Sequence, residues 1–183
     1  YQLATPDGIV TIEGAGLRPE EGIVISGYVR ASQKLRRLLL KRNGLGNEGV
    51  DAIVSAASEN ALATVEALDF GYNKVTRNGA ALIADKLEML RSITALDLAG
   101  NSIGDSGMAV IGEALLKHSG HCRLRFLTCG SFALGEGVTE INLVGTGLSV
   151  PAMMLLSGVL KFNRTLKTLR LDDNPAISDE GCE

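Results

Sequence analysis

Apolar residues recur along this chain in one spacing, with hydrophobic residues at positions 1, 4, 6 and 11 of each copy. Four segments follow this spacing closely: 35–45, 65–75, 93–103 and 166–174. Three follow it weakly: 7–17, 121–129 and 138–148. Positions 4 and 6 face one side of an extended chain, which is typical of a short strand with one buried face. In the copy at 121–129, this spacing turns Leu124 and Phe126 inward and Arg125 outward.

Position 9 of the pattern marks the end of each strand. It is asparagine in the four close copies, at Asn43, Asn73, Asn101 and Asn174. The weak copies have Ala15, Cys129 and Thr146 there. A short amide side chain can hydrogen-bond the backbone where the chain turns off a strand, so we predict this role for the asparagines. Successive position-9 residues are 28 or 30 apart, except that only 17 separate Cys129 from Thr146.

Between these segments the apolar spacing changes to that of a helix. After Gly49, apolar residues follow at offsets of 4, 5 and 8, which lie on one helical face, and the same holds after Gly79 and Gly107. One strand–turn–helix unit cannot bury its own apolar face, whereas stacked units share a continuous core. We therefore predict a single α/β solenoid over residues 1–183. It has parallel strands on the concave side, helices on the convex side, and about seven repeats, one of which lacks its helix.

Two phrases carry a family resemblance: Leu-Asp-Leu-Ala-Gly-Asn-Ser-Ile-Gly-Asp-Ser-Gly at 96–107 and Lys-Phe-Asn-Arg-Thr-Leu at 161–166. They resemble the ribonuclease-inhibitor type of leucine-rich repeat, which NOD-like receptors, the GTPase activators of Ran and the tropomodulins share. The resemblance covers about residues 7–181 and implies a horseshoe that binds proteins. It is specific for the repeat class and for no single member. Ala15 departs from the pattern and predicts a distorted first turn.

The composition and charge of the chain limit the kinds of partner that it can bind. The chain has 183 residues, a formal net charge of −3 and 4% aromatic residues, which favours neither nucleic acid nor a membrane as partner. The longest nearly apolar stretch, 148–160, contains Pro151 and is too short to cross a bilayer. Three cysteines without paired spacing favour a reducing compartment, so we predict a cytoplasmic location. The chain opens with Tyr1 and stops where another helix is expected, and we interpret it as a fragment of a longer chain.

Three motifs suggest other chemistry, and the repeat explains each of them better. Residues 44–49 match G-x-G-x-x-G, but these glycines fall in columns that other repeats share. A cluster of His118, His121, Cys122 and Cys129 lacks the spacing of a zinc site. With only two histidines, no set of residues for general acid–base catalysis emerges. We therefore predict no catalytic residues, no cofactor and no metal.

The concave face is the expected binding surface. Its central column is predicted to contain Thr11, Leu39, Asp69, Asp97, Arg125, Asn142 and Arg170. The flanking positions are Arg37, Lys41, Arg42, Tyr72, Arg123, Asp172 and Asp173. This mixture of acids and bases suits a charged, specific protein partner. The alternative is a solvated face without a partner, since scattered surface charges need no explanation.

The short interval is the most individual feature of the chain. The segment Gly130 to Gly137 replaces a helix and reads as a loop that contains Phe132 and Leu134. We expect either a gap or bend on the convex side, where a second partner could dock, or neighbouring helices that close over it.

The sequence thus predicts a module that binds another protein through its concave strand face, as a monomer and without enzymatic activity. Two alternatives stay open. One is a GTPase-activating domain of the Ran-activator type, which the resemblance implies. The other is an architectural segment of a scaffold.

Overall fold

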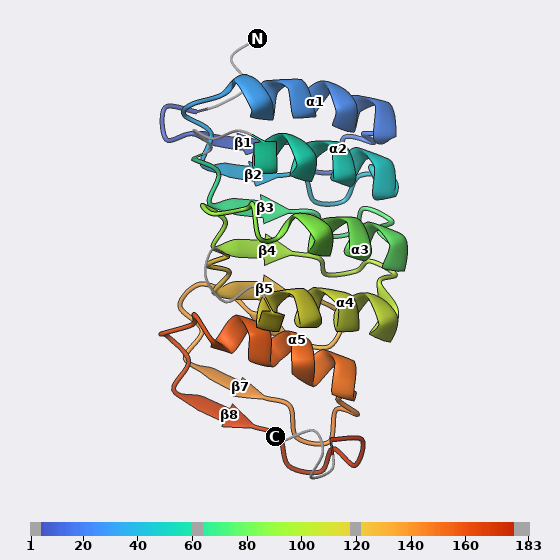
Figure 1. The fold of residues 1–183 in the computed structure, drawn as a ribbon, viewed down its shortest axis with the longest axis vertical. Helices are drawn as coiled ribbons and strands as arrows, with labels where there is room; N and C mark the ends of the chain where they lie inside the picture. The colour runs from blue at the N-terminus through green and yellow to red at the C-terminus, as the bar shows by residue number, and fades with distance from the viewer. Residues whose placement is uncertain (1–4, 60–63, 118–121, 178–183) are drawn as a thin grey trace.

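The computed structural model describes residues 5–59, 64–117 and 122–177, and its elements alternate between strand and helix (Figure 1). In chain order the first eight are β1 (Ile9–Thr11), α1 (Pro19–Ala31), β2 (Arg37–Leu39), α2 (Gly46–Glu59), β3 (Ala67–Asp69), α3 (Arg77–Lys86), β4 (Ala95–Asp97) and α4 (Gly104–Lys117). They are followed by β5 (Phe126–Thr128), β6 (Ala133–Leu134), β7 (Glu140–Asn142), α5 (Val150–Leu160) and β8 (Thr168–Arg170). This architecture confirms the predicted solenoid.

Strands β1 to β5 form a parallel sheet in sequence order. Each strand is three residues long, and its middle residue points into the core. These middle residues lie side by side and are buried: Val10, Leu38, Leu68, Leu96 and Leu127. Because side chains alternate along a strand, the first and third residues of each strand face the opposite, concave side.

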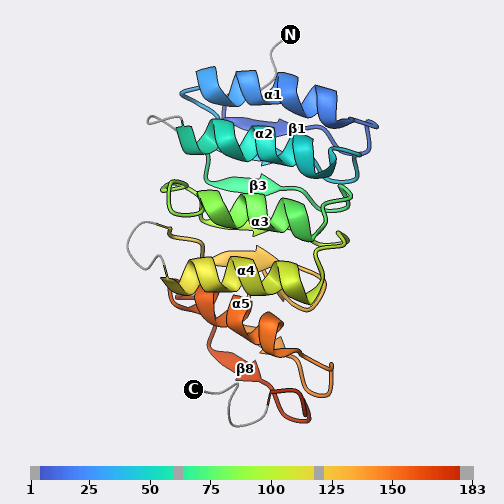
Figure 2. The same ribbon diagram turned by 45° about the vertical axis from the view of Figure 1, so that its right-hand side comes forward.

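The helices form a second layer on one side of the sheet and lie in front of the strands in Figure 2. Local sequence starts them: Thr76 and Ser149 accept hydrogen bonds from the backbone N–H groups of Asn78 and Ala152 at 3.3 Å, as helix N-caps do. Small residues bring neighbouring helices close, as where Gly22 of α1 packs on the backbone of Gly49 in α2. Glycine 49 of the G-x-G-x-x-G motif therefore serves helix packing. None of the helices in the described ranges is long and apolar enough to cross a membrane.

The asparagines at the strand ends form a ladder that ties each repeat to the one before it. Asn101 donates from Nδ2 to the carbonyl of Phe70 at 2.9 Å, and its Oδ1 accepts from the N–H groups of Asn73 and Val75, both at 2.9 Å. Asn43, Asn73 and Asn174 each bond the preceding repeat in the same way. The predicted backbone role of these asparagines is confirmed.

The fifth repeat has a different register from the predicted one. Leu127, not Leu124, pairs with Leu96, and Thr128 pairs with Asp97. The prediction was wrong because both registers place apolar residues at inward positions of this segment. The observed register wins by burying four of them fully or nearly so: Leu124, Leu127, Cys129 and Phe132. Cys129 therefore fills a core position, and Phe132 takes the place of the ladder asparagine.

The short interval folds into a β-hairpin instead of a loop. Since Phe132 cannot bond the backbone through its side chain, the chain reverses, and Cys129 N donates to the carbonyl of Phe132 at 2.9 Å. β6 then pairs antiparallel with β5 and ends the first sheet. β7 pairs with β8 in a separate two-stranded sheet, which slopes relative to β1–β5 (Figure 1).

Of the two alternatives for the convex side, the structure shows the second, in which α4 and α5 close over the missing helix. These two helices pack directly: a carbon added at Gly112 would lie 2.8 Å from the backbone N of Leu155, and one at Gly158 would lie 2.6 Å from Cβ of Leu115. Phe132 and Leu134 are buried beneath. The neighbouring helices have closed over the missing one, and the break falls in the concave sheet instead.

Candidate functional site

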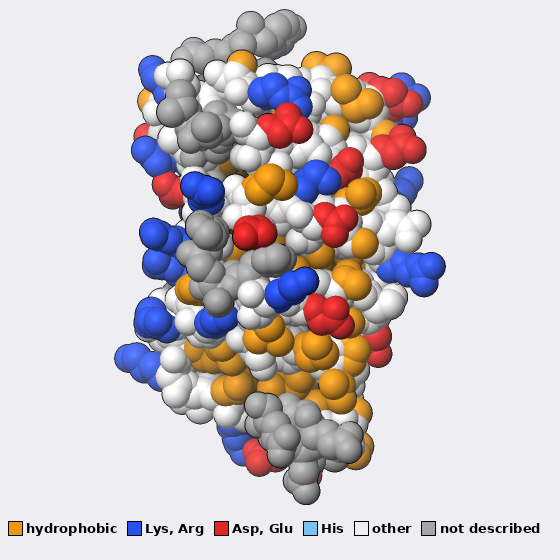
Figure 3. All heavy atoms as spheres, viewed as in Figure 1, with side chains coloured by type: hydrophobic (Ala, Val, Ile, Leu, Met, Phe, Trp, Pro, Cys, Tyr) orange, Lys and Arg blue, Asp and Glu red, His pale blue; other side chains and the backbone are white. Residues whose placement is uncertain are grey.

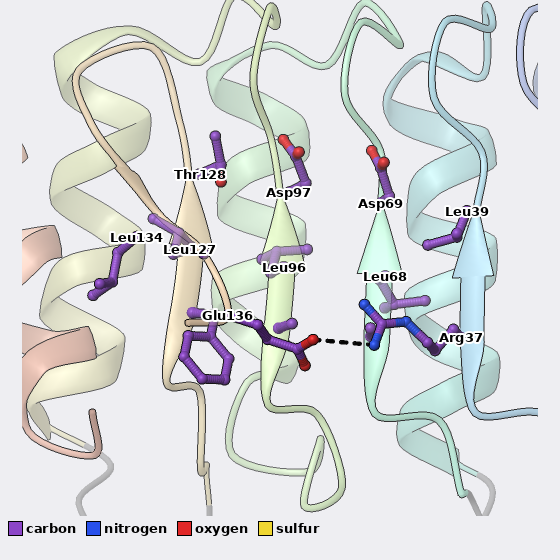
Figure 4. Close-up of a pocket in the computed structure, with 14 residues that line it drawn as sticks. Arg37, Leu39, Leu68, Asp69, Leu96, Asp97, Leu127, Thr128, Leu134 and Glu136 are labelled. Atoms are coloured by element: carbon purple, nitrogen blue, oxygen red, sulfur yellow. Dashed lines mark hydrogen bonds and ion pairs between the residues drawn. The ribbon is translucent and has the colours of Figure 1, made fainter. Parts of the chain in front are cut away.

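The concave face of β2 to β5 combines an apolar floor with charged margins. The first residues of these strands are Arg37, Ala67, Ala95 and Phe126, and the third residues are Leu39, Asp69, Asp97 and Thr128. Figure 4 shows the third residues in a row at the carboxyl ends of the strands. The first row is thus apolar apart from Arg37, and the second row is acidic at its centre.

The hairpin adds a wall to this surface. After β6 the chain runs back over the concave side, and Glu136 reaches Arg37 on β2, with Nη1 and Oε2 3.2 Å apart (Figure 4). The residues between them line a pocket of about 180 Å³ that is open to solvent. Glu136 and Arg37 are half exposed, so solvent screens their attraction and the ion pair adds little to stability. Its role is to hold the hairpin over the concave face.

The two acids at the strand ends also stabilise the local backbone. Asp69 Oδ1 accepts a hydrogen bond from Gly71 N at 2.8 Å, and Asp97 Oδ1 accepts one from Ala99 N at 2.7 Å. Such contacts hold the turn that leaves each strand. Burial raises the pKa of the Asp69 carboxyl above its ordinary value, and the nearby negative charge of Asp97 adds to the rise, against the opposing hydrogen bond from Gly71.

We expect Asp69→Asn to stabilise the protein at neutral pH. The amide retains an acceptor for Gly71 N but carries no charge to desolvate. Because the folded-state pKa is raised, ionised Asp69 opposes folding above that pKa, and protonation removes this cost as the pH falls. The advantage of the variant, measured by urea unfolding at neutral pH and near pH 4, should therefore shrink toward acid. A margin that grows toward acid would contradict this explanation.

Tyr72 stands beside the acidic edge and is, among the described residues, the one aromatic side chain that is largely exposed. It is 49% exposed and has a positive φ of 56°. Its ring lies near two cations, with Lys41 Nζ 5.8 Å and Arg42 Cζ 5.7 Å from the ring centre. The ring also covers the backbone of Gly100 in the next repeat. We call Lys41, Arg42 and Tyr72 the aromatic rim.

The described residues offer little for catalysis or metal binding. Cys122 and Cys129 are free and buried, and burial raises the pKa of both thiols, which keeps them protonated. No group of three or more metal-ligating side chains occurs in ranges 5–59, 64–117 and 122–177. His118, His121 and Cys182 lie outside the described residues.

Comparison with known protein families identifies the family of this chain. The family described as "Leucine Rich repeat" matches residues 31–54, 61–84, 90–112 and 162–183, together just over half of the chain. The chain belongs to the leucine-rich-repeat family. The matched segments include all four ladder asparagines, Asn43, Asn73, Asn101 and Asn174, so the family pattern and the ladder coincide.

Its relatives place the repeats in the ribonuclease-inhibitor type. The chain is 26% identical over 191 residues to the ribonuclease inhibitor of Sus scrofa, which covers 96% of the chain and 41% of the inhibitor. It is 28% identical over 159 residues to NACHT, LRR and PYD domains-containing protein 3 of Bos taurus, covering 87% of the chain and 14% of that protein. The chain thus spans less than half the length of these relatives.

A solved structure confirms the fold of this leucine-rich-repeat chain independently. The structure of "Leiomodin-1 Actin-Binding Site 2 (ABS2)" superposes with a TM-score of 0.64 at 16% identity, over 85% of this chain and 80% of that one. At this identity the likeness concerns the fold alone.

The structure brings together only part of the predicted leucine-rich-repeat surface. Seven predicted residues lie on or directly after β2, β3 and β4: Arg37, Leu39, Lys41, Arg42, Asp69, Tyr72 and Asp97. Arg123 and Arg125 precede β5, and the shifted register gives the place of Arg125 in the central column to Thr128. Thr11 ends β1 at the sheet edge. Asn142 and Arg170 belong to the separate sheet of β7 and β8, and Asp172 and Asp173 lie in the turn after β8.

Sequence reasoning missed the floor and the wall of the pocket. Phe126 was expected in the core, but the register turns it to the concave side beside Ala95. Glu136 was assigned to a helix-free loop without a role, yet it pairs with Arg37 from 99 residues away. The spacing of three residues between Leu124 and Leu127, as in the other repeats, was the signal that could have found the register.

Proposed function

We propose that this leucine-rich-repeat chain is a protein-interaction module that binds its partner on the concave face of β2 to β5 and the adjoining aromatic rim. The relatives support a binding role, since the porcine protein is named for inhibiting ribonuclease, itself a protein. We further propose that the module is not an enzyme, binds as a monomer, and works in the cytoplasm, where unpaired cysteines stay reduced.

Tyr72 is the observation that carries the proposal. The turn position of Tyr72 has a positive φ in several repeats: Gly14, Gly100 and Gly145 occupy it, and so do Arg42 and Asp173. A residue other than glycine costs about 1 kcal/mol or more there. Half of the ring is nevertheless exposed, between two cations. Tyrosine and arginine are the residues that most often dominate the binding energy of protein interfaces. We infer that the strain is retained for binding.

The charges favour a protein over nucleic acid. A polyanion would gain from Lys41 and Arg42 but would meet Asp69 and Asp97 at the neighbouring edge of the same surface. A protein surface can match both signs, because its own acids and bases alternate. The apolar floor of Ala67, Ala95 and Phe126 gives such a partner a dry centre to pack against.

Affinity capture with matched variants tests the proposal. The native chain, the concave variant Leu39→Gln/Tyr72→Gly and the convex control Met89→Gln/Leu116→Gln are immobilised and exposed to a lysate of the source cell. Leu116 lies on α4 and Met89 in the turn after α3, and both are exposed, so the control keeps the core. We expect the concave variant to capture at least about tenfold less of the partner protein than the native chain, and the control to capture as much as the native chain. Equal loss in both, or loss in the control alone, would refute the concave site.

A further inference from the structure

One edge of the molecule, where the helices end and the strands begin, has matched charges in its first half. Ion pairs join successive repeats there: Arg30 to Glu59 at 2.8 Å, and Arg36 to Glu66 at 2.7 Å. Figure 3 shows Lys and Arg side chains along this edge, at the left of the view, with Asp or Glu beside them in its upper part. In the first repeats, an acid of the next repeat thus offsets a cation of the one before.

The second half of the same edge lacks such acids. Residues 114–135 and 141–171 contain no Asp or Glu, although the whole chain has a formal net charge of −3. These two segments bring exposed cations to the edge, which together we call the basic edge: Lys117, Arg123, Arg125, Lys161, Arg164 and Lys167. None of them forms an ion pair with another residue that the structure describes.

Hydrogen bonds hold the segments of the basic edge together. Asn163 is buried, and its Nδ2 donates to the carbonyl of Arg125 at 2.9 Å, which joins the turn after α5 to the start of β5. The Oδ1 of Asn163 accepts from two backbone N–H groups of its own turn, at 2.9 and 2.8 Å. Lys161 Nζ donates to the carbonyl of Leu116 at the end of α4, at 3.4 Å. The cations therefore sit on one fixed surface.

Helix ends explain only part of this positive charge. Lys117 lies in the last turn of α4, Lys161 caps α5, and Arg164 Nη1 donates to the carbonyl of Lys161 at 3.3 Å. Cations favour such places because the carboxyl end of a helix carries partial negative charge. Within the described ranges, no side-chain partner is found for the remaining cations: Arg123, Arg125 and Lys167.

The position of Arg125 and Lys167 sharpens the contrast with the first half. Each directly precedes a strand, as Arg36 does where it meets Glu66. In the preceding repeat, Arg125 N bonds the carbonyl of Thr94 at 2.9 Å, and Lys167 N bonds that of Thr139 at 2.8 Å. A threonine offers no charge to offset the cation. Unmatched like charges on one edge repel each other, so the basic edge gains from a negatively charged partner.

We propose that the basic edge binds an acidic segment of a protein, at a site separate from the concave face and independent of it. Clustered carboxylates would complement the unmatched cations. The extent of the surface favours a short segment, because Glu59 and Glu66 stand on the first half of the same edge. A long uniform polyanion, such as duplex nucleic acid or an anionic membrane, would extend past the basic edge and meet these acids.

Fluorescence anisotropy with a labelled oligoglutamate peptide tests this contact. The native chain should bind the peptide, and Arg125→Glu/Lys167→Glu should weaken binding at least about tenfold, because two attractions become repulsions. The control Lys74→Glu/Arg77→Glu makes the same change in net charge at the opposite edge, where both side chains are exposed. It should weaken binding less than about twofold. An equal loss in both variants, or no binding by the native chain, would overturn the proposal.

Two further arms separate the other places and partners. Lys41→Glu should leave peptide binding unchanged, whereas a loss there as large as in the edge variant would assign the acidic segment to the aromatic rim and overturn the proposal. Duplex DNA and phosphatidylserine vesicles should bind the native chain more weakly than the peptide does. Tighter binding of either one would overturn the proposal and assign the basic edge to that class of partner.

Lysine acetylation of the native chain provides a readout without any substitution. Bound peptide should slow acetylation of Lys117, Lys161 and Lys167 about threefold or more, because it covers their ammonium groups, and should leave Lys74 unaffected. Equal protection at all four lysines, or none at the first three, would overturn the proposal.

Discussion

Asn101→Ala should lower the free energy of unfolding by about 3 kcal/mol, because it leaves two backbone N–H groups without their acceptor. Asn101 Oδ1 accepts from both Asn73 N and Val75 N at 2.9 Å, and its Nδ2 joins two successive repeats through the carbonyls of Phe70 and Leu98. Removing one side chain therefore breaks a tie between repeats in the middle of the ladder. Urea unfolding followed by circular dichroism measures the effect.

Asn142→Ala is the matched control for this prediction. Asn142 also accepts a backbone hydrogen bond, from Val144 N at 3.1 Å, but both groups lie at an exposed position where water can replace the side chain. We expect a loss of about 0.5 kcal/mol. If the two variants lose equal stability, burial of the ladder is not what gives Asn101 its importance.

Gly112→Ala should destabilise the protein by about 2 kcal/mol, although alanine normally favours a helix interior over glycine by about 1 kcal/mol. The added methyl would lie 2.8 Å from Leu155 N and 2.9 Å from the carbonyl carbon of Met154, and backbone atoms cannot move aside as a side chain can. The substitution therefore forces α4 and α5 apart where they close over the missing helix. Thermal and urea unfolding both measure the loss.

Gly27→Ala provides the opposite control in α1. The position is in the interior of a helix of similar length, and an added carbon there meets nothing within 4 Å. We expect a gain of about 0.5–1 kcal/mol from helix propensity alone. A stabilising Gly112→Ala would show that α4 and α5 have room between them, against the packing described above.

The fold was predictable because the same sequence pattern occurs in four close copies. Every close copy has asparagine at position 9, leucine at position 4 and a large apolar residue at position 6, and the structure places them as expected. Where a copy of the pattern is weak, its sequence alone does not determine the strand register. Leu124, Phe126, Leu127 and Cys129 satisfy two registers, and only the packing of four side chains in the shared core selects one of them.

The candidate site was predictable only where it follows the strand columns. Leu39, Asp69 and Asp97 lie where the alternation of a strand puts them. Glu136 does not, because its contact with Arg37 depends on a hairpin that reverses the chain across three strands, and no local spacing encodes that distance. The three residues of the aromatic rim were all predicted to lie on the concave surface. Their geometry could not be predicted, because it depends on the positive φ of Tyr72, a conformation that glycine adopts much more readily than tyrosine.

Site-specific photo-crosslinking tests the central claim most directly, because it reports contact with a partner in the cell. A photoreactive phenylalanine analogue replaces Tyr72 on the concave rim or Met89 in the turn after α3, both about half exposed. We predict that position 72 yields a discrete crosslinked protein and that position 89 yields none. A crosslink from position 89 alone would place the partner on the convex face and contradict the account.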